Sequence, residues 1–210
     1  MIARHLFSLA AGLAVILTVP AAADTCRTEI AALFSGPLDP FQRPPHRQIV
    51  QIYDADGTAT RLYRNTIESP LKTIAGEPAA NFFTMAIDRD LWNGPSETGP
   101  WTKNPAQMPD GREATLRRQY AEQRDNLTDT VCHGQTEDGL LHYTYRTQTT
   151  PDATGSFFGS LDQIWIDPDT GQIVKFELAE FINPWTEGVS PERHVIAVEF
   201  DPTIKVDAPD

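Results

Sequence analysis

The stretch that decides the fold runs from Leu161 to Leu178 and reads LDQIWIDPDTGQIVKFEL. Two runs rich in β-branched and aromatic residues flank Asp167-Pro-Asp-Thr-Gly171, whose aspartate, proline and glycine are typical of tight turns. The pattern therefore predicts a long antiparallel hairpin. Because side chains in a strand alternate with a period of two, we expect Val174 and Phe176 on one face and Ile173 on the other.

Other segments show the same alternation of apolar and polar residues. It predicts strands over residues 46–53, 58–68, 71–75, 81–87, 140–147, 157–166 and 193–200. Two segments have apolar residues at helical spacing instead, and they predict helices over residues 25–38 and 111–130. The sequence thus indicates an α+β fold built on an antiparallel sheet.

The segment from Asp90 to Gly111 breaks the pattern because it contains four prolines and three glycines. It also holds Trp92 and Trp101, two of the four tryptophans of the chain. A long segment of this kind inside a domain is usually a functional or a mobile loop. We expect a loop here, either a lid over a binding site or a part of the local core.

The first 23 residues have the pattern of a secretory signal peptide. Arg4 provides a positive start, residues 6–19 are an apolar run, and Ala21-Ala-Ala23 is a small-residue cleavage site. No cysteine stands at the cleavage point, which argues against a lipoprotein anchor. We expect one domain over residues 24–210, periplasmic or secreted after cleavage, with no transmembrane segment.

The charge of the chain narrows the choice of partners. The formal net charge is −12, and loss of residues 1–23 changes it to −13 because Arg4 is the only charged residue removed. Such an acidic surface argues against binding to nucleic acids and to anionic membranes. It does not distinguish among proteins, lipids and small ligands.

Two cysteines, Cys26 and Cys132, remain in the exported chain. In an oxidising compartment such a pair indicates a disulfide, here one that joins the start of the chain to its middle. The alternative is that Cys132 and the adjacent His133 form a nucleophile pair. Sequence neighbours in a strand or a helix point away from each other, so the disulfide is the better interpretation.

Motifs for catalysis or metal binding are missing from the sequence. The chain has no zinc-binding helix motif, no glycine-rich phosphate loop and no Gly-x-Ser-x-Gly elbow. The histidines of the exported chain, at positions 46, 133, 142 and 194, do not stand at metal-ligand spacing. We expect a non-catalytic protein without cofactor or metal; the alternative is a hydrolase that uses His142 or His194 with an acid.

The strands carry more apolar surface than two helices can cover. Either the sheet curls on itself, or an apolar face stays open toward a ligand. The order of elements is a signal peptide, a short helix, hairpin strands, a tryptophan-bearing loop, a middle helix, the WIDPDTG hairpin and a last strand followed by FDPTIKVDAP. In this order the chain resembles the LolA-like and LppX-like superfamily of exported proteins.

The resemblance implies an unclosed β-barrel, a curved antiparallel half-barrel sheet whose concave side is covered by about two helices. Members of the superfamily carry lipids or lipoproteins in that cavity, so we expect a lipid or a lipoprotein acyl chain as the ligand. The aromatic residues that we expect in the cavity or its lid are Trp101, Tyr143, Tyr145, Trp165 and Phe176. The alternative is an envelope interaction or structural module with a filled core, a protein partner and no ligand.

Overall fold

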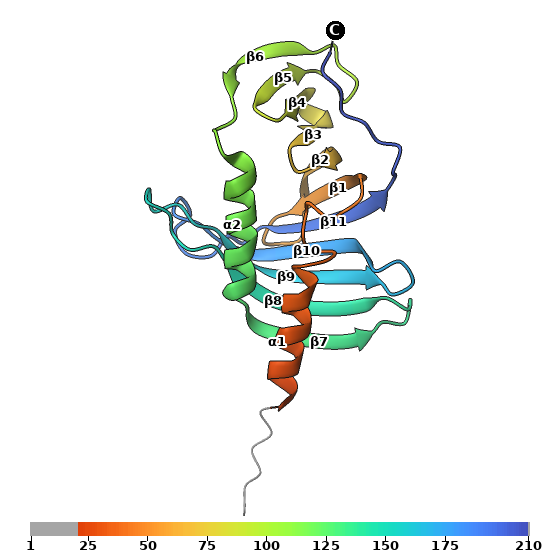
Figure 1. Ribbon diagram of the computed structural model, residues 1–210, viewed down its shortest axis with the longest axis vertical. Helices are drawn as coiled ribbons and strands as arrows, with labels where there is room; N and C mark the ends of the chain where they lie inside the picture. Colours follow the sequence, from red (N-terminus) through yellow and green to blue (C-terminus); the bar gives the residue numbers. More distant parts are fainter. Residues whose placement is uncertain (1–20, 210) are drawn as a thin grey trace, which may run out of the picture.

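The computed structural model describes residues 21–209, and Figure 1 shows their arrangement. The elements are, in chain order, α1 (Ala21–Leu33), β1 (His46–Tyr53), β2 (Ala59–Ser69), β3 (Lys72–Glu77), the 3₁₀ turn η1 (Pro78–Ala80), β4 (Phe82–Ile87), β5 (Asp90–Gly94), β6 (Thr102–Gln107), α2 (Arg112–Asp125), β7 (Thr128–Gln135), β8 (Leu141–Gln148), β9 (Gly159–Asp167), β10 (Gln172–Ile182) and β11 (Arg193–Phe200). Residues 1–20 of the predicted signal peptide lie outside this described range.

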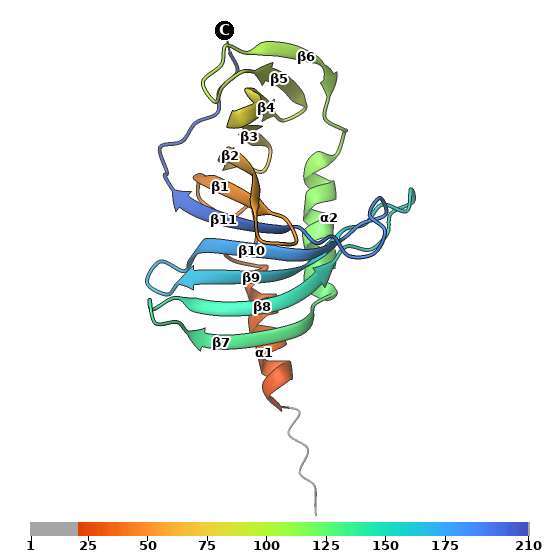
Figure 2. The same cartoon turned by 180° about the vertical axis from the view of Figure 1, so that it is seen from behind.

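All eleven strands belong to one sheet, in the order β6-β5-β4-β3-β2-β1-β11-β10-β9-β8-β7. Every pair is antiparallel, because the chain forms two series of hairpins that meet where β1 pairs with β11. Strands β6 and β7 lie at the two ends of this order, where β6 pairs with β5 and β7 with β8 but not with each other, so the sheet of the described residues does not close. Helices α1 and α2 cover one face of β7 to β11, on the near side in Figure 1 and behind the sheet in Figure 2. The predicted α+β half-barrel is confirmed.

The predicted hairpin is present as β9 and β10, with one correction to its side-chain pattern. Ile173 pairs with Ile166, but the next pair is Lys175 with Trp165, so a β-bulge shifts the register between them. Because the bulge contains one extra residue, Ile173 faces the same side as Phe176, and both are buried in one core. The expectation that Ile173 would lie opposite Phe176 was wrong.

Two other segments differ from the sequence-based prediction. The expected loop between Asp90 and Gly111 contains β5, which pairs with β4, and the edge strand β6. The helix expected to reach residue 130 ends at Asp125, and strand β7 begins at Thr128. In both cases pairing with a neighbouring strand outweighs local preference, because the ladder satisfies backbone groups that a loop or a frayed helix would leave to water.

The first core lies between the helices and the sheet. Its fully buried members include Ile30 of α1 and Tyr145 and Ile164 of the sheet. The disulfide between Cys26 and Cys132 joins α1 to β7 across this core, and it confirms the predicted pairing. The helix face of the sheet is therefore the face on which Cys132 and Tyr145 lie.

The second core lies on the opposite face of the sheet. Residues paired across strands share a face. The face that the helices cover can therefore be traced from β9 to β2 through Ile164, Phe176, Ile196, Val50 and Tyr63. On β2 and β3 the same face continues through Asn65 and Ala75. The second core uses the alternate residues, and its members are Ile74, Phe83, Met85, Trp92 and Val206.

The C-terminal tail covers this second core. Val206 is only 1% exposed, and its backbone N–H donates a hydrogen bond of 2.7 Å to the carboxylate of Glu68 on β2. That hydrogen bond is the main cause of the lowered pKa of Glu68. Gly76 is required on β3, because an added Cβ would lie 2.4 Å from the ring of Phe83. The tail thus covers the second core, as α1 and α2 cover the first.

None of the helices in residues 21–209 is both long enough and apolar enough to cross a membrane.

Candidate functional site: a cavity between the helices and strands β8 to β11

A half-open cavity of about 360 Å³ lies between the helix layer and the sheet. Its walls come from the segment after α1, from α2, from the β8–β9 loop, and from strands β1 and β8 to β11. The residues that line it are Phe34, Leu38, Arg43, Gln48, Tyr120, Gln123, Tyr145, Phe158, Ser160, Asp162, Phe176, Leu178, Phe181 and Ile196. Half of these side chains are aliphatic or phenylalanine, which is typical of a site for a small apolar ligand.

The strand register places one acidic residue in the middle of the cavity floor. Asp162 on β9 lies between Tyr145 on β8 and Leu178 on β10. Its side chain is only 9% exposed, and it accepts a hydrogen bond of 2.5 Å from the hydroxyl of Ser160. The hydroxyl of Tyr145 also hydrogen-bonds the carboxylate. Two hydroxyl groups therefore hold the carboxylate in a mostly apolar surrounding.

Burial changes the proton affinity of this group. Loss of hydration disfavours the charged form, and it raises the pKa of Asp162 to about 6 against the hydrogen bonds from Ser160 and Tyr145. Burial also raises the pKa of Tyr145 and that of Tyr120, the residue of α2 above it. Both tyrosines consequently stay neutral donors at ordinary pH.

Arg43 forms the opposite wall of the cavity. Its Nε donates to the carbonyl of Pro37 at 2.7 Å, and one terminal nitrogen donates to the carbonyl of Leu38 at 2.8 Å. The guanidinium carbon lies 5.1 Å from the centre of the Phe176 ring, in cation–π geometry. Burial lowers the pKa of Arg43. These contacts fix the arginine, and no carboxylate of residues 21–209 forms an ion pair with it.

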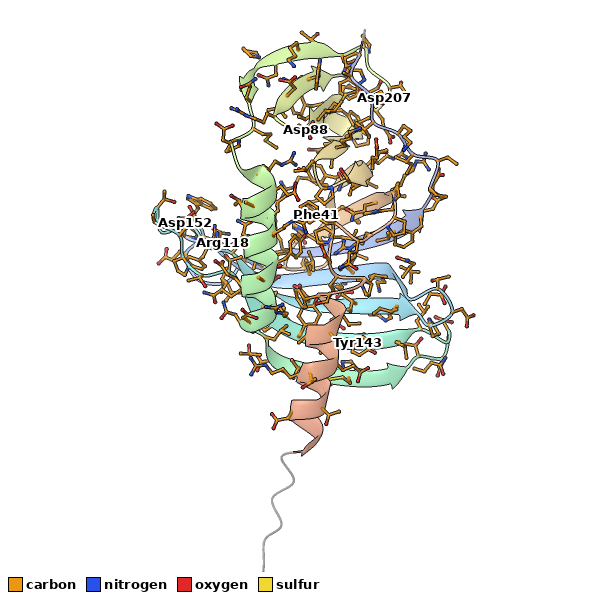
Figure 3. The ribbon with its side chains drawn as sticks, viewed as in Figure 1. Phe41, Asp88, Arg118, Tyr143, Asp152 and Asp207 are labelled. Carbon is orange, nitrogen blue, oxygen red and sulfur yellow. A yellow bond between two sulfur atoms is a disulfide. The ribbon has the colours of Figure 1, made fainter. Side chains whose placement is uncertain are left out.

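Helix α2 lies over the cavity, and its side chains are at most half-buried, that of Tyr120 among them. Polar contacts hold it. The hydroxyl of Thr147 on β8 donates to its Gln123 carbonyl at 2.7 Å, and Arg27 of α1 donates to its Asp125 carbonyl at 3.2 Å. The guanidinium of Arg117 lies 3.9 Å from the ring of Phe41, which Figure 3 shows beside the helix. A helix held this way can leave the sheet at little hydrophobic cost.

Two loops extend past α2 at the rim of the cavity, and Figure 3 shows them beside the labelled Asp152. Phe158 ends the β8–β9 loop; it lines the cavity and is 43% exposed. The β10–β11 loop starts beside Phe181, another lining residue, and presents Trp185 at 80% and Val189 at 55% exposure. The rim thus carries large apolar side chains that the described chain does not cover.

The five residues expected at a ligand site lie in three places. Tyr145 and Phe176 line the cavity. Tyr143 lies beneath α1, where its hydroxyl donates to Glu29 at 2.6 Å, as its position in Figure 3 indicates. Trp101 packs against the second core, on the other face of the sheet. Trp165 is on that other face too, so neither tryptophan lines the cavity.

Neighbouring side chains occupy both faces of the Trp165 ring. The ring of His142 stacks on one side at 4.5 Å, and the Nζ of Lys175 lies 4.0 Å from the ring centre. His133 stacks in turn on His142 at 4.2 Å. This row across β7 to β10 uses the faces of the indole for contacts within the protein, which stabilise the sheet.

Sequence reasoning missed Asp162 and Arg43. The signal for Asp162 was present, because the residue falls on the same face as Ile164 and Ile166 in the alternation that opens β9. An acid in that series marks a charge on the buried side of a strand. Arg43 lies in the proline-rich loop after α1, and no local pattern predicts its position.

The histidines considered for catalysis have other contacts. His142 shares a hydrogen bond of 3.1 Å with the amide oxygen of Gln163. His194 has its Nε2 3.7 Å from Glu192, beyond hydrogen-bond distance. Neither contact pairs the imidazole with a hydroxyl or thiol nucleophile.

Comparisons with solved structures find similarities of low sequence identity and low TM-score. No protein-family model and no curated protein matches the chain. A DUF1329 family protein from Desulfovibrio piger is 12% identical, with 87% of this chain and 95% of that one covered and a TM-score of 0.31. A protein with a YmcC-like fold from Bacteroides fragilis is also 12% identical, with 75% and 96% covered and a TM-score of 0.24.

Proposed function

We propose that this chain is an exported, non-catalytic protein that holds a lipid or another acyl chain in the cavity between its helices and strands β8 to β11. The observation that carries the proposal is the cavity itself, about 360 Å³ in volume and bounded by apolar side chains. This volume is at the lower end of the roughly 300–1,000 Å³ typical of small-ligand sites. It suits one acyl chain of moderate length better than the several chains of a lipoprotein anchor.

Two further features support a carrier. The exposed side chains of Phe158, Trp185 and Val189 offer an apolar path at the rim. Helix α2 is held by polar contacts, so it can move without exposing a core of its own. A signal-peptide pattern over residues 1–23 supports action outside the cytoplasm.

Native mass spectrometry tests the proposal on protein purified without detergent from an export-competent host. We expect an added mass that organic extraction removes. A matched pair of variants locates the site, because Ile196 lines the cavity while Val195 is on the other face of the same strand. Ile196→Trp should abolish the added mass, and Val195→Trp should retain it. A bare wild-type chain that also binds no added amphiphile would refute the proposal.

A second candidate is a module that binds a protein partner and carries no ligand. It is favoured by Trp185, whose 80% exposure is unusual for so large an apolar residue. This alternative predicts a bare chain in the mass spectrum and a complex on pull-down that Trp185→Ser abolishes. The carrier predicts that Trp185→Ser retains the bound mass.

A further inference from the structure

The charged residue on the cavity floor suggests which head group a ligand carries. Asp162 is the acidic residue in the lining, and it lies directly between Tyr145 and Leu178. It forms no ion pair with a lysine or arginine of residues 21–209; its partners are the hydroxyls of Ser160 and Tyr145. A buried carboxylate without a cation is costly unless a ligand supplies the missing donor.

The one cation in the lining is already occupied by other groups. Arg43 donates to the carbonyls of Pro37 and Leu38 and lies against the ring of Phe176. An anionic ligand head would have to compete with these contacts and would also face the Asp162 carboxylate. The cavity therefore combines a free acceptor with an engaged donor, and this combination disfavours a carboxylate head.

On the basis of the proposed function, we infer that the cavity selects amphiphiles whose head group, an ammonium or a hydroxyl, donates a hydrogen bond to Asp162, and that it disfavours fatty acids. The apolar tail then contacts Phe34, Phe158 and Phe176, which line the same cavity. Selection follows from Coulomb attraction for an ammonium and from hydrogen bonding alone for a hydroxyl.

Isothermal titration at pH 7.5 with n-decylammonium chloride, 1-decanol and sodium decanoate tests this selection on the mature protein. We expect the ammonium to bind at least tenfold more tightly than the carboxylate, with the alcohol between them. In Asp162→Asn the ammonium-to-carboxylate ratio should shrink to within about threefold, because the amide keeps an acceptor but loses the charge. Asp138→Asn, on the exposed β7–β8 turn, makes the same charge change away from the cavity and should keep the wild-type ratio.

The pH dependence gives a second measurement that needs no variant. The groups that face or act on Asp162 are Tyr145 and Arg146 of β8, Tyr120 of α2 and Arg43 of the loop after α1; across β10 the neighbour is the uncharged Leu178. These tyrosines and arginines do not change charge between pH 5.0 and 7.5. With a pKa of about 6, roughly a tenth of Asp162 remains ionised at pH 5.0. The affinity for decylammonium should fall about tenfold at pH 5.0, while that for decanol changes little.

The outcomes separate the two proposals. Equal binding of all three amphiphiles, unchanged by Asp162→Asn and by pH, would overturn the head-group selection and leave the carrier function in place. Tighter binding of decanoate than of decylammonium would overturn the selection as well. If none of the three binds, the proposed function itself fails.

Discussion

At the scale of single residues, Asp162 is the position where stability and ligand binding oppose each other. A carboxyl whose pKa rises from 3.8 to about 6 on folding costs at most about 3 kcal/mol at neutral pH. A filled apolar core would avoid that cost. Residues that a fold keeps in spite of such a penalty are candidates for function, because selection for stability alone would remove them.

The cost of Asp162 predicts a specific pH dependence. The folded protein holds this proton more tightly than the unfolded chain, so the contribution of Asp162 to stability is greatest below pH 3.8 and declines as pH rises through 6. In Asp162→Asn this decline is absent. We expect the variant to gain about 1–2 kcal/mol over wild type at pH 7.5 and little at pH 4, measured by urea unfolding at both values.

The control for this prediction is Asp138→Asn, whose exposed carboxyl lies outside the cavity. Its unfolding free energy should follow that of wild type at both pH values. Parallel pH profiles for wild type and Asp162→Asn would show that the carboxyl is not destabilised in the folded protein.

At the scale of elements, the two helices are attached to the sheet in different ways: a covalent bond anchors α1, and non-covalent contacts hold α2. The disulfide joins Cys26 in α1 to Cys132 in β7 and closes a loop with a sequence separation of 106 residues. On the chain-entropy account a loop of about this length stabilises by about 4–5 kcal/mol, and measured values are more often 2–4. Helix α2 has no disulfide; hydrogen bonds and the stacking of Arg117 on Phe41 are among the contacts that hold it.

Removal of the disulfide should therefore lower global stability and loosen α1 first. We expect Cys26→Ser with Cys132→Ser to reduce the free energy of unfolding by about 2–4 kcal/mol. Hydrogen exchange should rise first in α1 and β7, where the bond is anchored. Reductant should produce the same change in wild type and none in the double variant; equal stability of the oxidised wild type and the double variant would contradict the prediction.

At the scale of the whole molecule, one continuous sheet carries two cores on opposite faces. The helices cover the face that contains Tyr145 and Ile164, and the C-terminal tail covers the face that contains Met85 and Trp92. The two halves meet at the ladder between β1 and β11. Each half can therefore lose its cover without direct loss of packing in the other.

A charge placed under the tail tests this division. Val206→Asp buries a carboxylate against Met85 and Trp92, and we expect it to cost about 3 kcal/mol or more. Hydrogen exchange should rise in β3 to β5 while β8 to β10 stay protected. Val189→Asp, in the exposed β10–β11 loop, should change stability by less than about 0.5 kcal/mol. A uniform rise of exchange over all strands in Val206→Asp would mean that the sheet unfolds as one unit.

The sequence by itself determined the features that depend on near neighbours. Alternation and turn residues predicted β1, β8, β11 and the β9–β10 hairpin, and the two cysteines predicted the disulfide. The resemblance to a family of unclosed half-barrels was sufficient to predict the fold class. The strands and the hairpin follow from local geometry, and the disulfide follows from the single pairing that two cysteines permit.

Only the tertiary structure decided which face each residue occupies and which residues meet. One bulge in β10 moved Ile173 to the side of Phe176, and strand pairing turned a proline-rich loop into β5 and β6. The change of buried face between the two halves separated Trp101 from Tyr145 and Phe176. Alternation along β9 placed Trp165 on the face opposite Ile164. The cavity, with Asp162 from β9, Arg43 from a loop and Tyr120 from α2, arises from segments far apart in the chain, whose contacts depend on register and packing that no local pattern encodes.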